Sequence, residues 1–217
     1  MKNKNRMLRF NVSERLAHWV HAISFTLLLI TGSALIFSAF GRLLGTQGLR
    51  TAGAVHRVMA YPFSFLTAAI LLLATPRSAL QWLRSIVTWS KNDLQFLAAF
   101  PKEFFGLKPK LPPQGKFNAG EKVNSLLTII GSLLMMITGW IMVYRDQFSA
   151  ATLGLVYPLH DLGALIMGAV IIGHAYLGLL HPGSREALNG MISGIVSERF
   201  AREHHALWYE ETRANGD

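Results

Sequence analysis

Four stretches of this chain are apolar over lengths that suit a lipid bilayer, and they limit its possible folds more than any other feature. A helix needs about 20 predominantly apolar residues to cross the hydrocarbon core. The stretches of this kind are about Leu16–Phe40, Ala52–Ala74, Val123–Tyr144 and Tyr157–Leu180. Only 15% of the 217 residues are charged, which is too few for an ordinary soluble protein. We therefore predict one all-α membrane domain over residues 1–217, a four-helix transmembrane bundle.

The positions of lysine and arginine predict how this bundle is oriented. Seventeen of the 21 basic residues lie in three segments that share one side of the membrane: Met1–Ala17, Pro76–Lys122 and Pro182–Asp217. The two short loops on the other side, Gly41–Thr51 and Arg145–Val156, hold few of them. Cytoplasmic segments carry the excess of basic residues, so both termini are expected in the cytoplasm. The net charge of +9 is then explained by topology and by anionic lipid, and it does not indicate nucleic acid.

The long cytoplasmic loop, residues 76–122, is expected to contain an interfacial helix. Aromatic and basic residues are mixed over Gln81–Phe105, which is typical of an amphipathic helix at the membrane surface, although a solvated loop is the alternative. Three prolines predict an irregular segment over Leu107–Asn118. The cytoplasmic tail, residues 182–217, is expected to hold a second interfacial helix over Glu186–His205.

Four histidines near the ends of the apolar stretches are the candidate functional residues: His18, His56, His160 and His174. His160 and His174 are fourteen residues apart, which is close to four helical turns, so they share a helix face about 21 Å apart along the axis. With both termini inside, His56 pairs by depth with His160 near the outer face, and His18 pairs with His174 near the cytoplasm. Two imidazoles from different helices are what a haem between helices requires. The pattern predicts two six-coordinate haems that transfer electrons.

Other interpretations of these residues stay open. A lone intramembrane histidine can simply bond across a helix interface, and zinc would be poorly supplied with ligands. His21 is an alternative to His18, and His181 to His174; a solvated or interface role is expected for His204 and His205 in the polar tail. The chain has no cysteine, which excludes iron–sulfur ligation and thioether haem attachment in it.

Two arginines near the predicted haems are candidate partners of the haem propionates. They are Arg15 and Arg57. For Arg15, a purely topogenic charge is the alternative.

The chain resembles the cytochrome b (gamma) subunit of respiratory formate dehydrogenase over nearly its full length. The residues that carry the resemblance are Glu14–Trp19, His56, Lys116–Lys122, His160 with His174, Gly194–Ser197 and His204–Tyr209. Cytochrome b subunits of nickel–iron hydrogenases share the broader fold. The chain departs from the family at Ala206, where a proline often follows the paired tail histidines.

The resemblance implies two haem b groups, ligated by His56 with His160 and by His18 with His174. It also implies a quinone site beside the cytoplasmic haem, where Asn118, Gly120 and His174 contact menaquinone or ubiquinone. Asn118 offers an amide donor and Gly120 gives access, although an N-cap role for Asn118 at the third span is an alternative.

The function expected from this resemblance is electron transfer within a larger complex of a bacterial inner membrane. An iron–sulfur (beta) subunit and a catalytic (alpha) subunit would deliver electrons at the outer face, and quinone would be reduced at the cytoplasmic face. Substrate oxidation is not expected in this chain. The first alternative is the cytochrome b subunit of a nickel–iron hydrogenase or another periplasmic oxidoreductase. The second alternative is a haem-free structural anchor or a small transporter.

Overall fold

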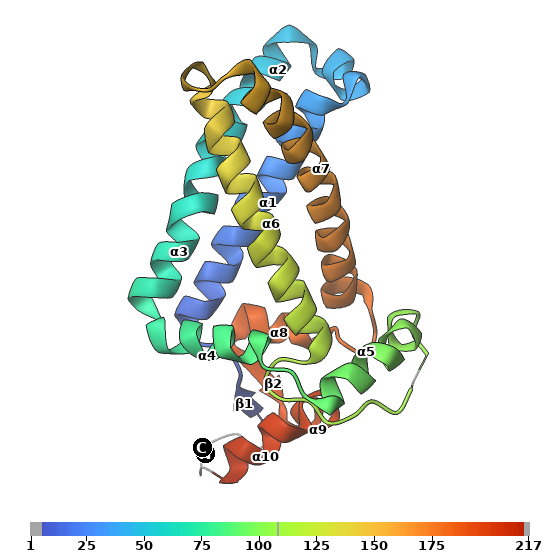
Figure 1. The fold of residues 1–217 in the computed structure, drawn as a ribbon. Helices are drawn as coiled ribbons and strands as arrows, with labels where there is room; N and C mark the ends of the chain where they lie inside the picture. The colour runs from blue at the N-terminus through green and yellow to red at the C-terminus, as the bar shows by residue number, and fades with distance from the viewer. Residues whose placement is uncertain (1–5, 108, 215–217) are drawn as a thin grey trace. The chain divides into compact units, whose positions relative to one another are not determined.

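The structure, a computed structural model, describes residues 6–107 and 109–214, and most of them are helical. Four helices in this part of the chain are long and apolar enough to cross a membrane (Figure 1): Val12–Ile36, Ser38–Ala74, Ala119–Val143 and Ala150–Leu180. The all-α fold class with four candidate spans is therefore confirmed.

The chain divides into two compact units. The first, here called the bundle unit, comprises residues 16–74 and 127–171. The second, here called the loop-and-tail unit, comprises the described residues of 1–15, 75–126 and 172–217. The expected single domain over 1–217 stays a prediction.

The bundle unit is formed by the apolar parts of four helices. These are α1 (Val12–Ile36), α2 (Ser38–Tyr61), α6 (Ala119–Val143) and α7 (Ala150–Ala175). Phe25, Phe63 and Met167 form its buried core, with partly buried leucine, isoleucine and methionine side chains around them. A Cβ at Gly131 would lie 2.0 Å from the sulfur of Met167, so the Met167 side chain fills the space that this glycine leaves between α6 and α7.

The second span continues α2 through a stretch of wider turns. After α2 come the π-helical turn η1 (Pro62–Leu66), the short α3 (Thr67–Ala69) and a second π-helical turn, η2 (Ile70–Ala74). Pro62 has no N–H to donate to the preceding turn, and in apolar spans a local π adjustment can satisfy the backbone groups that a proline leaves unpaired.

The helices extend beyond the apolar stretches, so both outer loops are shorter than predicted. Residues 41–51 lie within α2, which begins at Ser38 and breaks only at Gly45, where φ is 65°. The turn η3 (Arg145–Gln147) follows the third span, and α7 begins at Ala150, before the predicted start at Tyr157. Hydropathy reports which residues suit lipid, whereas the helical backbone can continue into water wherever its bonds are satisfied.

The predicted interfacial helix at Gln81–Phe105 is wrong as a single element. The structure has two helices there, α4 (Pro76–Val87) and α5 (Lys91–Phe104). Ser90 begins α5 with a capping box, in which its hydroxyl accepts from the N–H of Asp93 and the Asp93 carboxylate accepts from the N–H of Ser90. The described residues between 107 and 118 form no helix, as the prolines predicted.

The predicted tail helix at Glu186–His205 is also wrong as a single element. After the π-helical turn η4 (Tyr176–Leu180), the tail forms α8 (Glu186–Ser193), β2 (Ile195–Ser197), α9 (Glu198–His204) and α10 (Ala206–Ala214). Gly194 ends α8 in the left-handed region, at φ 85°. Strand β2 then pairs antiparallel with β1 (Arg6–Leu8), with Met7 opposite Val196.

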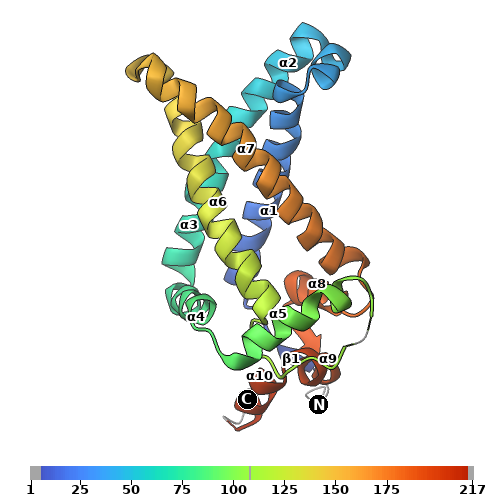
Figure 2. The ribbon, with the colours of Figure 1, turned by 45° about the vertical axis from the view of Figure 1, so that its right-hand side comes forward.

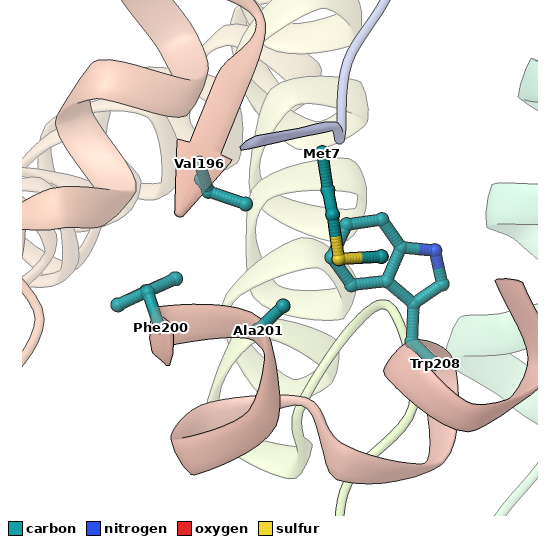
Figure 3. Packing of buried hydrophobic residues seen from close by; sticks show 5 residues of the cluster. All are labelled: Met7, Val196, Phe200, Ala201 and Trp208. Atoms are coloured by element: carbon teal, nitrogen blue, oxygen red, sulfur yellow. The ribbon is translucent and has the colours of Figure 1, made fainter. Parts of the chain in front are cut away.

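The small sheet and the tail helices enclose the core of the loop-and-tail unit. Figure 2 shows β1 beside α9, with α10 following in the tail. Met7, Val196, Phe200, Ala201 and Trp208 form a buried cluster contributed by β1, β2, α9 and α10 (Figure 3). The N-terminal segment and the C-terminal tail are therefore parts of one packed structure.

Candidate functional site

His56 of α2 and His160 of α7 face each other inside the bundle unit. Their ring centroids are 6.3 Å apart and their planes are inclined by 69°. A metal–imidazole bond of about 2.0 Å puts the ring centroid roughly 3 Å from the metal, so two rings on opposite sides of one ion have centroids about 6 Å apart. The spacing of this pair therefore suits two axial ligands of a single ion.

The other nitrogen of each ring is held by a threonine. The Nδ1 atom of His56 lies 2.9 Å from Oγ1 of Thr31, and Nδ1 of His160 lies 2.8 Å from Oγ1 of Thr138. Both histidine rings thus use Nδ1 for hydrogen bonding and keep Nε2 for a ligand. Metal-ligating histidines commonly have this arrangement.

The donor set fits haem better than a bare metal ion. In residues 6–107 and 109–214, no three His, Asp or Glu side chains gather into a possible metal site. Two histidines alone leave an ion poorly coordinated, whereas a porphyrin supplies the four equatorial nitrogens itself. The residues present at His56 and His160 therefore fit a bis-imidazole haem.

The other predicted pair is divided between the two units. His18 lies in α1 within the bundle unit, with its ring edge-on to Trp19 at 5.2 Å. His174 lies near the end of α7, in the loop-and-tail unit. Because these residues fall in different units, their pairing stays a prediction.

The two alternative ligands lie in different surroundings. The ring of His21 stacks on Phe63 at 5.0 Å, and its Nε2 is buried with no hydrogen-bond partner among the described residues. His181 is 3% exposed and uses both nitrogens: Nδ1 bonds to Ser184 at 3.1 Å, and Nε2 to the carbonyl of Glu103 at 2.8 Å. These bonds favour a structural role for His181 at the end of the fourth span.

The two arginines considered as partners of the haem propionates lie in different units. Arg57 follows His56 in the bundle unit, and its guanidinium lies 3.5 Å from where a Cβ on Gly53 would be. Arg15 donates to the backbone carbonyls of Ile192 and Asn11, within the loop-and-tail unit. Arg15 therefore fastens the start of α1 to α8, and a propionate contact for either arginine stays a prediction.

Asn118 and Gly120, the predicted quinone contacts, lie at the start of α6. Asn118 Oδ1 accepts from the N–H of Glu121 at 2.9 Å, and the Glu121 carboxylate accepts from the N–H of Asn118 at 3.0 Å. This reciprocal capping box is the alternative role that the sequence offered for Asn118. A Cβ at Gly120 would lie 3.2 Å from Oδ1 of Asn118 and would make only ordinary contacts with Phe100 and Phe96, so the glycine leaves room for the capping amide of Asn118.

Two partly buried ion pairs hold this segment in place. Arg9, 3% exposed, donates at 2.9 Å to both carboxylate oxygens of Glu121, and Lys116 pairs with Glu14 at 3.2 Å. The pair between Lys116 and Glu14 joins the two sequence motifs that carry the resemblance, Glu14–Trp19 and Lys116–Lys122.

A further buried pair, between Lys122 and Asp93, was not foreseen from the sequence. The Lys122 ammonium lies 2.9 Å from the Asp93 carboxylate and 3.0 Å from the carbonyl of Thr88. Burial raises the pKa of Asp93, but hydrogen bonds from Lys122 and Ser90 outweigh it and hold that pKa below its usual value. The lowered pKa favours the charged form of Asp93, and its bond with Lys122 links α5 to α6.

The threonines that bond His56 and His160 were also missed. Hydroxyls are common in apolar helices and rarely signal a site alone. One signal was available, because Thr31-Gly32 and Thr138-Gly139 are the same dipeptide on the first and third spans.

Comparison with known proteins agrees with this geometry. The chain is 27% identical to the formate dehydrogenase cytochrome b556 subunit of Haemophilus influenzae, over 97% of this chain and 85% of that protein. It is 23% identical to the formate dehydrogenase cytochrome b556(fdo) subunit of Escherichia coli K12, over 98% of this chain and 96% of that protein. It is 25% identical to the nitrate-inducible formate dehydrogenase cytochrome b556(Fdn) subunit of the same bacterium, over 97% of this chain and 94% of that protein. The expected resemblance is confirmed.

A family model covers most of the chain as well. The model for prokaryotic cytochrome b561 matches residues 9–194, which include all four candidate histidines and both threonines that bond them. Membership of that family implies haem b, in agreement with the facing imidazoles of His56 and His160. The chain belongs to the prokaryotic cytochrome b561 family.

Proposed function

We propose that this chain is the membrane-anchoring, di-haem cytochrome b subunit of a respiratory formate dehydrogenase. It would carry electrons from a periplasmic iron–sulfur subunit across the membrane to quinone at the cytoplasmic side. The observation that carries the proposal is the facing pair His56 and His160, with ring centroids 6.3 Å apart and both Nδ1 atoms bonded. A bound haem with two axial imidazoles supplies reversible one-electron transfer.

The proposed ligands are His56 with His160 for one haem, and His18 with His174 for the other. Positions fourteen residues apart on α7 put His160 and His174 at two depths of the same span. This separation is what supports a two-centre path across a core of about 30 Å.

Both termini are proposed to be cytoplasmic. The bias of basic residues supports this orientation. The pairing of β1 with β2 adds support, because an N-terminal strand and a tail strand in one sheet must lie on the same side of the membrane.

The quinone, menaquinone or ubiquinone, is proposed to contact Asn118, Gly120 and His174. In the described structure Asn118 uses its Oδ1 in the capping box, so its amide Nδ2 is the group proposed to donate to a quinone carbonyl. Inward electron movement opposes the membrane potential by about 2.3 kcal/mol per 100 mV, which a strongly reducing donor such as formate can supply.

The proposed partners are the iron–sulfur (beta) and catalytic (alpha) subunits, within a larger oligomer of a bacterial inner membrane. The names of the relatives support formate as the substrate of that complex. The family is broader than these relatives, so a hydrogenase cytochrome b subunit is the second candidate. Co-purification of this chain with its partners, followed by assay with formate and with hydrogen, separates the two.

The test of this proposal is the haem content of ligand variants. The complex should contain two haems for each copy of this chain, measured as pyridine haemochrome against protein. His56→Ala and His160→Ala should each remove the same one of the two, because each removes one axial ligand of a shared iron. His181→Asn, as a control, should keep both. Full haem content in the His56 and His160 variants would refute the ligand assignment, and a complex without Soret absorbance would favour a haem-free anchor or a transporter.

A further inference from the structure

The two halves of the bundle unit present the same two groups, a threonine hydroxyl and a glycine α-carbon, to the facing histidines. On α1, Thr31-Gly32 contacts the ring of His56 from α2. On α6, Thr138-Gly139 contacts the ring of His160 from α7. In each case the helix that precedes the histidine's helix among the four spans supplies the dipeptide.

The direction of the hydrogen bonds follows from the backbone. The hydroxyl of Thr31 donates to the carbonyl of Leu27 at 2.7 Å, and that of Thr138 donates to the carbonyl of Leu134, also at 2.7 Å. A hydroxyl has one proton, so each Oγ1 accepts from the histidine and Nδ1 carries the hydrogen. The lone pair of each ring is then on Nε2, and the accepting oxygen makes that nitrogen a stronger electron donor.

The glycines limit the position of the rings. A Cβ at Gly32 would lie 3.2 Å from Cε1 of His56, and a Cβ at Gly139 would lie 3.3 Å from Cε1 of His160. Each ring therefore rests against a bare α-carbon while its Nδ1 is bonded one residue away. Together the two contacts restrict the rotation of the ring about its Cβ–Cγ bond.

We propose that Thr31-Gly32 and Thr138-Gly139 are matched positioning elements that fix the tautomer and plane of the two axial imidazoles and lower the reduction potential of the iron between them. The inference rests on the proposed function, because it needs His56 and His160 to share one haem. Stronger donation from Nε2 favours ferric over ferrous iron, so the threonine bonds should lower the potential. Since the halves match, each threonine should contribute by a similar amount.

The test uses the purified complex with Thr31→Val and Thr138→Val, which keep the shape of the side chain and remove the hydroxyl. In a spectroelectrochemical titration, the reduction potential of one haem should rise. The reduction equilibrium constant should change on the order of tenfold, which corresponds to about 59 mV for one electron. Thr31→Ser and Thr138→Ser should restore the original potential. Ser24→Ala is the matched control, because Ser24 is a buried hydroxyl of α1 that donates to the carbonyl of Val20 at 2.6 Å.

Several outcomes would decide against the proposal. Unshifted potentials in both valine variants at full haem content would overturn it. If the valine variants do not assemble, Gly32→Ala and Gly139→Ala provide the test. The added methyl group should rotate the histidine ring and thereby change the low-spin ferric EPR g-values. Unchanged g-values would overturn the proposal. Failure of the proposed function is distinct: the His56→Ala and His160→Ala complexes would then keep both haems. If they lose one haem and the threonine variants have normal potentials, only the present inference fails.

Discussion

His205 is a buried, neutral histidine in the tail, where a solvated or interface role was expected. Its side chain is 1% exposed, and its Nδ1 lies 2.9 Å from the carbonyl oxygen of Gly115, to which it donates. Burial lowers the pKa of His205 from 6.5 to about 4, with a smaller contribution from the charge of Arg9. The residue therefore belongs to the core of the loop-and-tail unit.

This depressed pKa predicts an acid-sensitive tail. The unfolded tail takes up a proton at about pH 6.5 and the folded tail only near pH 4, so stability is full above 6.5 and falls as the pH drops between these values. A shift of this size corresponds to at most about 3 kcal/mol. Hydrogen exchange of backbone amides in residues 195–214 should quicken over that window, after correction for intrinsic rates. His205→Asn, which keeps a donor toward Gly115, should weaken this pH dependence and leave only the part due to His204, whose pKa burial also lowers. An undiminished dependence would contradict the assignment.

The sequence could predict that His56 and His160 come together but not what orients their rings. An ionisable side chain in an apolar stretch stands out because burying it in lipid is expensive. Thr31 and Thr138 have no such signal, since a hydroxyl can satisfy itself on the carbonyl four residues earlier, as both do here. The likeness of the two threonine–histidine pairs is also hard to see in the sequence. The partners lie far apart, by 25 positions from Thr31 to His56 and by 22 from Thr138 to His160.

At the scale of elements, the four spans could be predicted and the surface elements could not. Long apolar stretches have few alternatives to a membrane helix, so composition alone identifies them. The prediction of one tail helix was wrong because the amphipathic pattern continues across Gly194. There the backbone takes a left-handed conformation, which ends α8 before β2 begins. The pairing partner of β2 lies at the other end of the sequence, where no local pattern shows it.

Gly194 is predicted to be required for this change from helix to strand. Its φ of 85° strains any residue with a Cβ by about 1–2 kcal/mol, and that atom would also lie 2.5 Å from the carbonyl oxygen of Phe10. Gly194→Ala should lower the thermal stability of the complex and deprotect the amides of β1 and β2. Gly115→Ala is the control, because a Cβ there meets nothing within 4 Å. Equal stability of the two variants would show that the turn is not under this constraint.

At the scale of the whole molecule, one orientation in the membrane connects the sequence, the sheet and the proposed direction of electron flow. The distribution of basic residues predicts that the N-terminus and the tail share a side, and the sheet between β1 and β2 supports this prediction. Only if that side is the cytoplasm do His56 and His160 lie toward the periplasmic donor. The orientation is therefore the premise on which the direction of transfer depends.

Single cysteines can test this orientation directly, because the chain has no cysteine of its own. The side chain of Asp146, in the turn after the third span, is 96% exposed, and that of Arg199, in the tail, is 85% exposed. In intact spheroplasts a membrane-impermeant maleimide should label Asp146→Cys and leave Arg199→Cys unlabelled until the cells are lysed. Labelling under denaturing conditions gives the total thiol of each variant. The reverse pattern would place the termini outside, put His56 and His160 next to the cytoplasm, and refute inward electron transfer to quinone.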